Sequence, residues 1–154
     1  MNRWKPNVTV ATVVERKHNN GDKQYLLVHE SRDGQNVYNQ PAGHLDKGES
    51  LLAAAERETL EETGWEVKVN GLIGIYRFIA PNGITYLRHA FSAKPIHHHP
   101  EKTLDEGIIE AVWFSYEQII EKRKHLRSEM VLQAIEDYQE GPLYPLALLR
   151  EPND

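Results

Sequence analysis

The sequence predicts a single domain in which strands and helices mix, of the α+β or α/β class. Several runs are rich in β-branched residues and are separated by turn sequences, as strands and their connections are. Two other stretches, residues 51–63 and 127–140, contain no Gly or Pro and carry helical start and stop signals. No repeat, low-complexity tract or linker divides the 154 residues, so we expect one domain over residues 1–154.

The first predicted elements form a hairpin. Residues 8–14 are rich in Val and Thr and predict a strand, and residues 25–29 predict a second strand. The sequence Asn-Asn-Gly-Asp at residues 19–22 favours a turn between them. Residues 31–36 are polar and predict a loop, and Pro41 then ends any regular strand pairing.

Residues 51–63 predict the first helix. Ser50 is suited to the N-cap position, because its side chain can accept a hydrogen bond from the first turn. Gly64 stands where the end of a helix favours a left-handed residue. We therefore expect the helix to begin directly after Ser50 and to end directly before Gly64.

A second hairpin is predicted in the middle of the chain. Residues 72–79 and 84–93 are strand-like, and the Pro-Asn-Gly sequence at residues 81–83 contains one of the strongest hairpin signals. Residues 94–107 are polar and contain prolines, so they predict a long loop.

The last part of the chain predicts one strand and two helices. Residues 109–115 predict the strand, residues 116–121 a short helix and residues 127–140 a longer one. Gly141 and Pro142 end the longer helix. Its predicted apolar face has residues spaced four apart, namely Met130, Ala134 and Tyr138.

Composition excludes several classes of protein. Without cysteine the chain has no disulfide, thiolate metal site or cysteine nucleophile. A net charge of −5 argues against binding a nucleic-acid polymer. No apolar run approaches the roughly 18 residues of a membrane helix, and the first residues lack a signal-peptide pattern, so we expect a cytoplasmic protein that has no membrane partner.

The first predicted helix carries a group of carboxylates. At about 100° per residue, Glu58, Glu61 and Glu62 fall within roughly a third of the helix circumference. Like charges at this spacing repel one another, and a hard divalent cation such as Mg²⁺ would compensate them. Arg57 lies beside this face, and Glu49 could pair with it and hold the preceding loop against the helix.

The arrangement of these residues resembles the Nudix box, the signature of hydrolases that act on a nucleoside diphosphate linked to another group. Gly43 is followed after five residues by Glu49, and after seven more by the run RETLEETGW at residues 57–65. Thr59 and Trp65 stand where the family usually has an aliphatic residue, which concerns local packing rather than metal binding.

Other short segments resemble the bacterial NudJ-type phosphatases of this family. They are residues 38–44, 79–81, 126–128 and 144–146. The resemblance implies the Nudix fold, an α/β/α sandwich of the α+β class with a mixed sheet between helices. It also implies that the helix of the box presents its glutamates to a cleft at the end of the sheet.

The resemblance further implies a metal-dependent reaction. Glu58 and Glu62 would bind Mg²⁺, with Mn²⁺ as the alternative cation, and the Ala42 carbonyl would add a ligand. Glu61 would be a ligand or hold a water, while Arg57 and Glu49 would orient these side chains. The expected reaction is attack of metal-activated water on a phosphorus of a pyrophosphate.

The residues leave the general base and the substrate contacts open. Candidates for the base are Glu58, Glu106 and Glu110. A tyrosine could stack on a flat ring while an arginine holds phosphate. The candidate substrate-binding residues are Tyr38, Gln40, Arg77, Tyr86 and Arg88.

Several substrates are compatible with the sequence. The resemblance favours nucleoside di- or triphosphates and thiamine-type pyrophosphates. Oxidised nucleotides, dinucleoside polyphosphates and nucleotide sugars are alternatives within the same enzyme class. A domain that senses a nucleotide without cleaving it is an alternative of another class, although the full set of glutamates favours the enzyme. The chain could act as a monomer or a homodimer.

Overall fold

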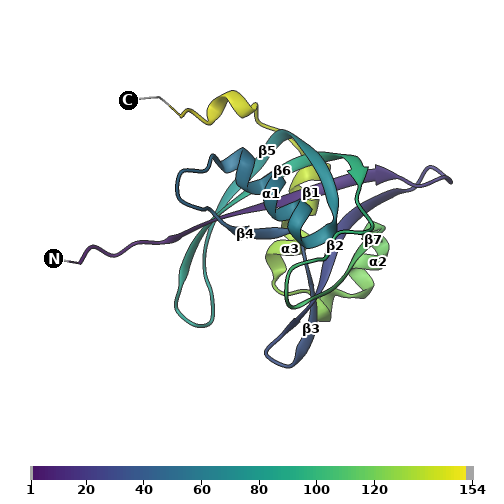
Figure 1. The fold of residues 1–154 in the computed structure, drawn as a ribbon, viewed down its shortest axis with the longest axis horizontal. Helices are drawn as coiled ribbons and strands as arrows, with labels where there is room; N and C mark the ends of the chain where they lie inside the picture. Colours follow the sequence, from purple (N-terminus) through teal and green to yellow (C-terminus); the bar gives the residue numbers. More distant parts are fainter. Residues whose placement is uncertain (1, 152–154) are drawn as a thin grey trace.

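Within the described residues, 2–151, seven strands pair into one mixed sheet with helices on both faces (Figure 1). The structure is a computed structural model, and residue 1 and residues 152–154 of the predicted domain lie outside the described residues. The strands are β1 (Asn7–Lys17), β2 (Lys23–Arg32), β3 (Gln35–Asn39), β4 (Ala42–His44), β5 (Trp65–Ile79), β6 (Thr85–His98) and β7 (Ile108–Phe114). The helices are α1 (Leu51–Thr63), α2 (Tyr116–Glu121) and α3 (Glu129–Glu140), with short 3-10 turns η1 (Arg123–His125) and η2 (Leu146–Leu148).

Strand β1 connects the two halves of the sheet, whose order is β3-β2-β1-β6-β5. It pairs in parallel with β6, from Asn7 opposite Tyr86 to Val14 opposite Ala93. On its other edge it pairs antiparallel first with β4 and then with β2. Strand β7 pairs with β2. The single parallel pair makes the sheet mixed, as predicted.

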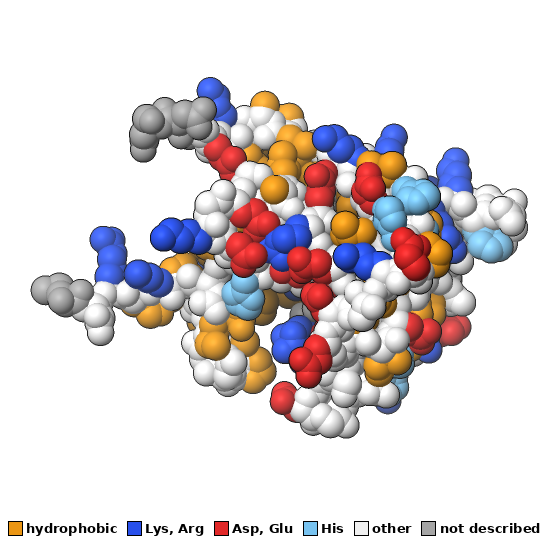
Figure 2. All heavy atoms as spheres, in the orientation of Figure 1, with side chains coloured by type: hydrophobic (Ala, Val, Ile, Leu, Met, Phe, Trp, Pro, Cys, Tyr) orange, Lys and Arg blue, Asp and Glu red, His pale blue; other side chains and the backbone are white. Residues whose placement is uncertain are grey.

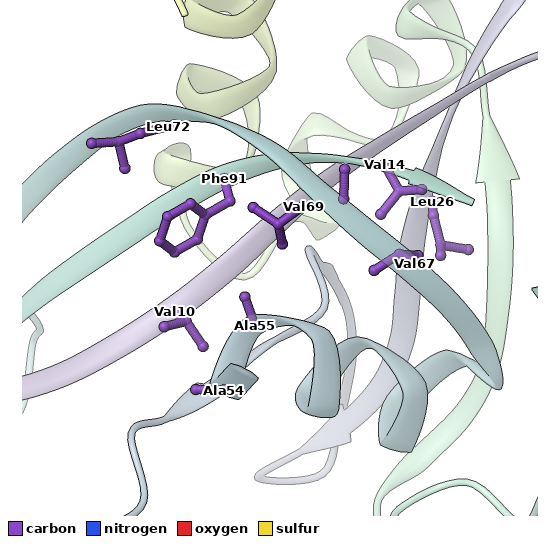
Figure 3. Close-up of a cluster of buried hydrophobic side chains, with 10 residues drawn as sticks. Val10, Val14, Leu26, Ala54, Ala55, Val67, Val69, Leu72 and Phe91 are labelled. Atoms are coloured by element: carbon purple, nitrogen blue, oxygen red, sulfur yellow. The ribbon is translucent and has the colours of Figure 1, made fainter. Parts of the chain in front are cut away.

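The two faces of the sheet bury separate apolar clusters. Alternate residues of a strand point to opposite faces, so Val10 of β1 packs toward α1 whereas Val13 packs toward α3. In the first cluster, Ala54 and Ala55 allow α1 to lie close against the sheet (Figure 3). In the second, α2 and α3 cover the opposite face with Ile119, Val131, Leu132, Ala134 and Ile135. This three-layer arrangement confirms the predicted α/β/α sandwich.

Most predicted elements are present. The hairpin over residues 8–29 is formed by β1 and β2, although only three residue pairs, from Glu15–Tyr25 to Lys17–Lys23, join these strands directly. Helix α1 has the predicted bounds, and Ser50 caps it by accepting a hydrogen bond from the Ala53 amide at 3.0 Å. Strands β5 and β6 form the second predicted hairpin and are longer than expected.

The predicted loop over residues 31–36 is wrong. Arg32 pairs with Gln35, so β2 and β3 form a tight hairpin around Asp33 and Gly34. Both turn residues have positive φ, 51° and 77°, which fits the turn type that matches the twist of antiparallel strands. The Asp33-Gly34 dipeptide is a hairpin-turn signal in the sequence. The polar residues on either side of it favour a loop instead, which is why the hairpin is not predicted.

Three further predictions need correction. The predicted loop over residues 94–107 is too long, because β6 continues to His98 through its pairing with β5. The longer C-terminal helix begins at Glu129, since Ser128 caps it. Its buried face also differs from the prediction: Met130 is only partly buried, and the buried residues of α3 are Val131, Leu132, Ala134 and Ile135.

The C-terminal segment covers part of the free edge of β5. The Leu72 amide donates to the Tyr144 carbonyl at 2.9 Å, and the Tyr144 amide donates back at 2.8 Å. These bonds satisfy the middle of an edge that would otherwise offer unpaired backbone groups. Among residues 2–151 no helix has the length and apolar character needed to cross a membrane.

Candidate metal centre and active-site cleft

The position of α1 determines where its glutamates lie. Its buried side, with Ala54, Ala55, Thr59 and Thr63, packs on the sheet. The Thr59 hydroxyl donates to the Ala55 carbonyl at 2.7 Å and lies 2.8 Å from the Thr12 hydroxyl of β1. A polar residue at this position of the box is therefore satisfied within the core. The carboxylates of α1 emerge at the border of this packed face.

Three carboxylates converge at the end of α1. One oxygen from each of Glu58, Glu62 and Asp105 lies within 4.8 Å of the others. Asp105 is brought there by the loop after β6, because its amide donates to the Glu61 carbonyl at 3.1 Å. A set of carboxylate oxygens at this spacing fits a hard divalent cation such as Mg²⁺ or Mn²⁺.

Burial makes the charge on this cluster costly. Burial, together with the nearby carboxylates of Glu58, Glu30 and Asp105, raises the pKa of Glu62 to about 8. The Ala42 amide, which donates to the Glu62 carboxylate at 2.8 Å, acts in the opposite direction. Burial likewise raises the pKa of Glu58, opposed by Arg57. The cluster thus carries more negative charge than its protein partners compensate, which is the condition a bound cation relieves.

Arg57 connects the box loop to the carboxylates of α1. Its Nε and Nη2 atoms donate to the two oxygens of Glu49 at 2.6 and 2.9 Å, which confirms the predicted pair. Its Nη1 atom donates to Glu58 at 2.9 Å and to Glu61 at 3.2 Å, while Nη2 also reaches the His44 carbonyl at 3.2 Å. The hydrogen bonds from Arg57 lower the pKa of Glu49. One planar guanidinium therefore orients two glutamates of the helix.

A cleft of about 500 Å³ adjoins the carboxylate cluster. Ala42 and Gly43, which contact Glu62 and Glu58, form part of its floor. Figure 2 shows acidic side chains gathered over α1 and a hollow below them. Its lining residues come from the β5–β6 hairpin, among them Phe78 and Tyr86, and from the β2–β3 turn, with Arg32 and Asp33.

The two walls of the cleft differ in chemistry. The β5–β6 hairpin contributes an apolar wall in which Phe78 and Tyr86 stack with ring centres 5.2 Å apart. The other wall has more basic than acidic side chains, with Arg32 from β2 and Arg127 from the segment before α3 against Asp33 of the β2–β3 turn. Arg88 of β6 lies between the walls. Such a cleft suits a ligand that has a flat organic part and an anionic part.

The structure brings only some of the predicted substrate residues to the cleft. Tyr86 and Arg88 line it. Tyr38 does not; its ring stacks on His29 and packs against Phe114 in the second apolar cluster. Gln40 is buried beneath the cleft, where it accepts a hydrogen bond from Arg88 at 2.8 Å. Arg77 is exposed on β5 and lies outside the lining residues.

The predicted acidic residues also separate. Glu61 lies beside the cluster and accepts from Arg57 but is not one of the three converging carboxylates. Glu106 is exposed and follows Asp105 directly. Glu110 lies on β7, where its carboxylate is 3.4 Å from His29, away from the lining residues of the cleft. Ala42 contacts Glu62 through its amide, and its carbonyl as a metal ligand stays a prediction.

The sequence did not point to several residues of the site: Asp105, Glu30 and Arg127, and the cleft residues Arg32 and Phe78. Asp105 lies in the predicted polar loop over residues 94–107, directly before Glu106, which stays a candidate for the general base. The position of Glu30 at the polar end of a strand predicts an exposed side chain. In the structure Glu30 is 4% exposed and forms an ion pair with Arg127 at 3.2 Å. The two residues are 97 positions apart, so no local pattern could have joined them.

Comparison with known proteins agrees with this geometry. The family model described as NUDIX domain matches residues 5–134. Two curated proteins named Phosphatase NudJ are similar to the chain: those of Shigella boydii and Escherichia coli K12 are 39% and 38% identical over 150 residues, which is 97% of this chain and 94% of each relative. A solved NUDIX hydrolase from Nitrosomonas europaea is 45% identical, with a TM-score of 0.89, over 96% of this chain and 98% of that chain.

These similarities extend over nearly the whole chain and include the loop and helix that carry the carboxylates. A family match over residues 5–134 leaves little of the chain outside the shared fold. The relatives also match in length, so the resemblance concerns the complete domain rather than one motif. The chain belongs to the Nudix family of hydrolases.

Proposed function

We propose that this hydrolase cleaves the phosphoanhydride bond of a small pyrophosphate with the help of a divalent cation. The observation that carries the proposal is the convergence of Glu58, Glu62 and Asp105 beside a cleft that has one basic and one aromatic wall. Nucleoside di- or triphosphates and thiamine-type pyrophosphates have the anionic and flat parts that such a cleft suits. The names of the curated relatives, phosphatases, support the same reaction class.

Glu58, Glu62 and Asp105 would hold Mg²⁺ or Mn²⁺, with the Ala42 carbonyl as a further donor. When bound, the cation would compensate the negative charge of the phosphate oxygens and lower the pKa of the water that attacks the phosphorus. Glu61 is proposed to hold a water molecule at the edge of the cluster, because it is partly exposed there and receives one hydrogen bond from Arg57.

The other residues of the box would keep the carboxylates in place. Arg57 binds Glu58 and Glu61 while Glu49 holds its other nitrogens, so rotation of either helix glutamate breaks a hydrogen bond. The bond from the Ala42 amide orients Glu62. Because these side chains are already held in one orientation, they lose little conformational entropy when the reactive geometry is reached.

Glu58, Glu106 and Glu110 are the proposed candidates for the general base. Glu58 is favoured because its carboxylate lies in the cluster, and burial raises its pKa, which makes it a stronger proton acceptor than an exposed carboxylate. Glu106 would need a rearrangement of its loop. Glu110 would have to leave His29 and cross to the other side of β7.

The aromatic wall is the proposed contact for the organic part of the substrate. Tyr86 is already stacked on Phe78, so its ring is held with limited freedom at the edge of the cleft. A ring of thiamine type or a nucleobase could pack on this wall with little loss of side-chain entropy. Oxidised nucleotides, dinucleoside polyphosphates and nucleotide sugars are the competing substrates that an assay must include.

The test is phosphate release from this panel of pyrophosphates at one fixed concentration of Mg²⁺, repeated with Mn²⁺. We expect hydrolysis by the wild-type protein and a loss of about a thousandfold in kcat in Glu62→Gln, since a ligand with a buried position is removed. Glu121→Gln, an exposed acid of α2, is the matched control and should behave as wild type. Binding of a nucleotide without turnover of any panel member would instead identify a sensor domain.

A further inference from the structure

Arg88 is a buried cation without an ionic partner. Its side chain is 7% exposed, and within residues 2–151 no carboxylate oxygen lies within the 4.0 Å of a salt bridge. Its Nε atom is buried and has no hydrogen-bond partner among the described residues. Burial of an unpaired charge is expensive, so native structures rarely leave such a group uncompensated.

The groups that do contact Arg88 are neutral. Its Nη2 atom donates to the Gln40 side chain at 2.8 Å and reaches the Asn39 side chain at 3.4 Å. The Gln40 amide is held in this orientation because its nitrogen donates to the Val131 carbonyl at 2.7 Å. These amides position the guanidinium at the cleft but do not neutralise it.

A second arginine lines the same cleft from the segment before α3. Arg127 donates to Glu30 at 3.2 Å, and its amide donates to the Tyr38 carbonyl at 2.8 Å, so both its backbone and its side chain are anchored. The side chain of Arg127 is 40% exposed, which leaves part of its guanidinium free to meet a ligand. Glu30 also lies 3.7 Å from Arg32, so one carboxylate serves two arginines.

The two arginines act on each other electrostatically. Burial and, after it, the charge of Arg127 lower the pKa of Arg88 to about 10, although the charges of Glu62 and Glu30 act in the opposite direction. An anion between them would relieve this repulsion and supply the missing partner of Arg88. Ser128, at the start of α3, lines the cleft beside Arg127, and the positive end of the helix dipole adds to the attraction.

We propose that Arg88 and Arg127 together bind a phosphate group of the substrate at the α3 side of the cleft. This assignment rests on the proposed function only for the orientation of the substrate. The organic part of the substrate lies on the wall formed by Phe78 and Tyr86, and the phosphate farthest from the organic part lies between the two arginines. The phosphate nearer the organic part then passes over Ala42 and Gly43, next to the carboxylate cluster.

The first experiment measures binding of inorganic phosphate by titration calorimetry to the wild-type protein and to Arg127→Gln. Arg127 is chosen because its side chain is half-exposed, so the replacement does not empty the core. We expect the dissociation constant to rise about tenfold to hundredfold, as for the loss of hydrogen bonds to a charged group. Arg123→Gln is the matched control, because Arg123 lies four residues before Arg127, pairs with Glu129 and is outside the lining residues of the cleft.

Two results would overturn the assignment. One is the absence of phosphate binding to the wild-type protein, and the other is equal affinity in the wild-type protein and Arg127→Gln. A second variant, Arg88→Lys, keeps the positive charge but loses the fork that meets Gln40, and we expect it to weaken phosphate binding while circular dichroism shows an intact fold.

Hydrolysis in the same preparations separates this inference from the proposed function. We expect Arg127→Gln to raise KM for the best panel substrate about tenfold, with kcat changed less than about threefold. If the wild-type protein hydrolyses no pyrophosphate, the proposed function fails, while the phosphate titration still decides the role of the arginines. If hydrolysis is normal and phosphate affinity does not depend on Arg127, only the arginine assignment fails.

Discussion

Gly43 of β4 lies directly against the carboxyl group of Glu58 on α1. A Cβ atom at position 43 would overlap the Glu58 side chain, whose three terminal atoms are its nearest neighbours. The glycine of the box is therefore required by space: its backbone does not adopt a positive φ, unlike that of Gly48 or Gly64. The absence of a side chain on the strand lets the helix carboxylate reach the cleft.

Gly43→Ala should consequently displace Glu58 and reduce activity while the fold survives. We expect kcat to fall about a hundredfold, since a shift of about 1 Å in a reacting group has this effect. Gly74→Ala is the control, because a Cβ there would meet only ordinary contacts with Tyr76. Steady-state kinetics and thermal unfolding of both variants measure the difference, and normal activity in Gly43→Ala would contradict the placement of Glu58.

Glu62 should make the stability of the metal-free protein depend on pH. Its pKa is about 8 in the folded state and near 4.5 when unfolded, so between these values the folded state holds a proton that the unfolded state has lost. The free energy of unfolding should therefore decrease as the pH rises from 4.5 to 8. Urea unfolding at pH 5 and pH 8 measures the slope.

Two comparisons isolate the contribution of Glu62 to this slope. Glu62→Gln cannot ionise, so its unfolding free energy should decrease less between pH 5 and pH 8 than that of the wild-type protein. Addition of Mg²⁺ or Mn²⁺ should stabilise the wild-type protein more at pH 8 than at pH 5, since the cation competes with the proton for the carboxylate. An identical pH slope in the variant would show that Glu62 is not the titrating group.

Asp105→Asn should weaken metal binding, because Asp105 supplies one of the three converging carboxylates. We expect the dissociation constant for Mn²⁺ to rise at least about tenfold, as when an oriented carboxylate is removed from a metal site. Glu106→Gln changes the adjacent acid and should leave Mn²⁺ affinity unaltered, since Glu106 is outside the cluster. Titration followed by electron paramagnetic resonance distinguishes the two, and the reverse order would reassign the third ligand.

Arg57→Lys should separate charge from geometry. Lysine keeps the positive charge but cannot donate to Glu49, Glu58 and Glu61 at once, so both helix glutamates gain freedom. We expect kcat to fall about tenfold to hundredfold while the free energy of unfolding changes by less than about 1 kcal/mol, because these ion pairs are partly exposed. Arg123→Lys, at an exposed ion pair with Glu129, is the kinetic control.

Local sequence determined the helix and the pairs that it carries. The signals at Ser50 and Gly64 bound α1 correctly, and the spacing of Glu58 and Glu62 placed both carboxylates on one face. The pairing of Arg57 with Glu49 also followed, since Glu49 directly precedes the helix and Arg57 lies eight residues further along it. These features depend on helical periodicity and on contacts within about two turns, which the sequence expresses directly.

Contacts between distant segments decided the rest. Asp105 reaches the cluster because its loop hydrogen-bonds to Glu61. Glu30 meets Arg127 because the segment before α3 is bonded to Tyr38 of β3, the neighbour of β2 in the sheet. Tyr38 was a reasonable stacking residue by type, yet the β2–β3 hairpin turns its ring into the second apolar cluster. Which of several similar side chains enters a cleft depends on strand register and on which face of the sheet each helix covers. Both are set by contacts between segments far apart in the sequence, so local patterns do not reveal them.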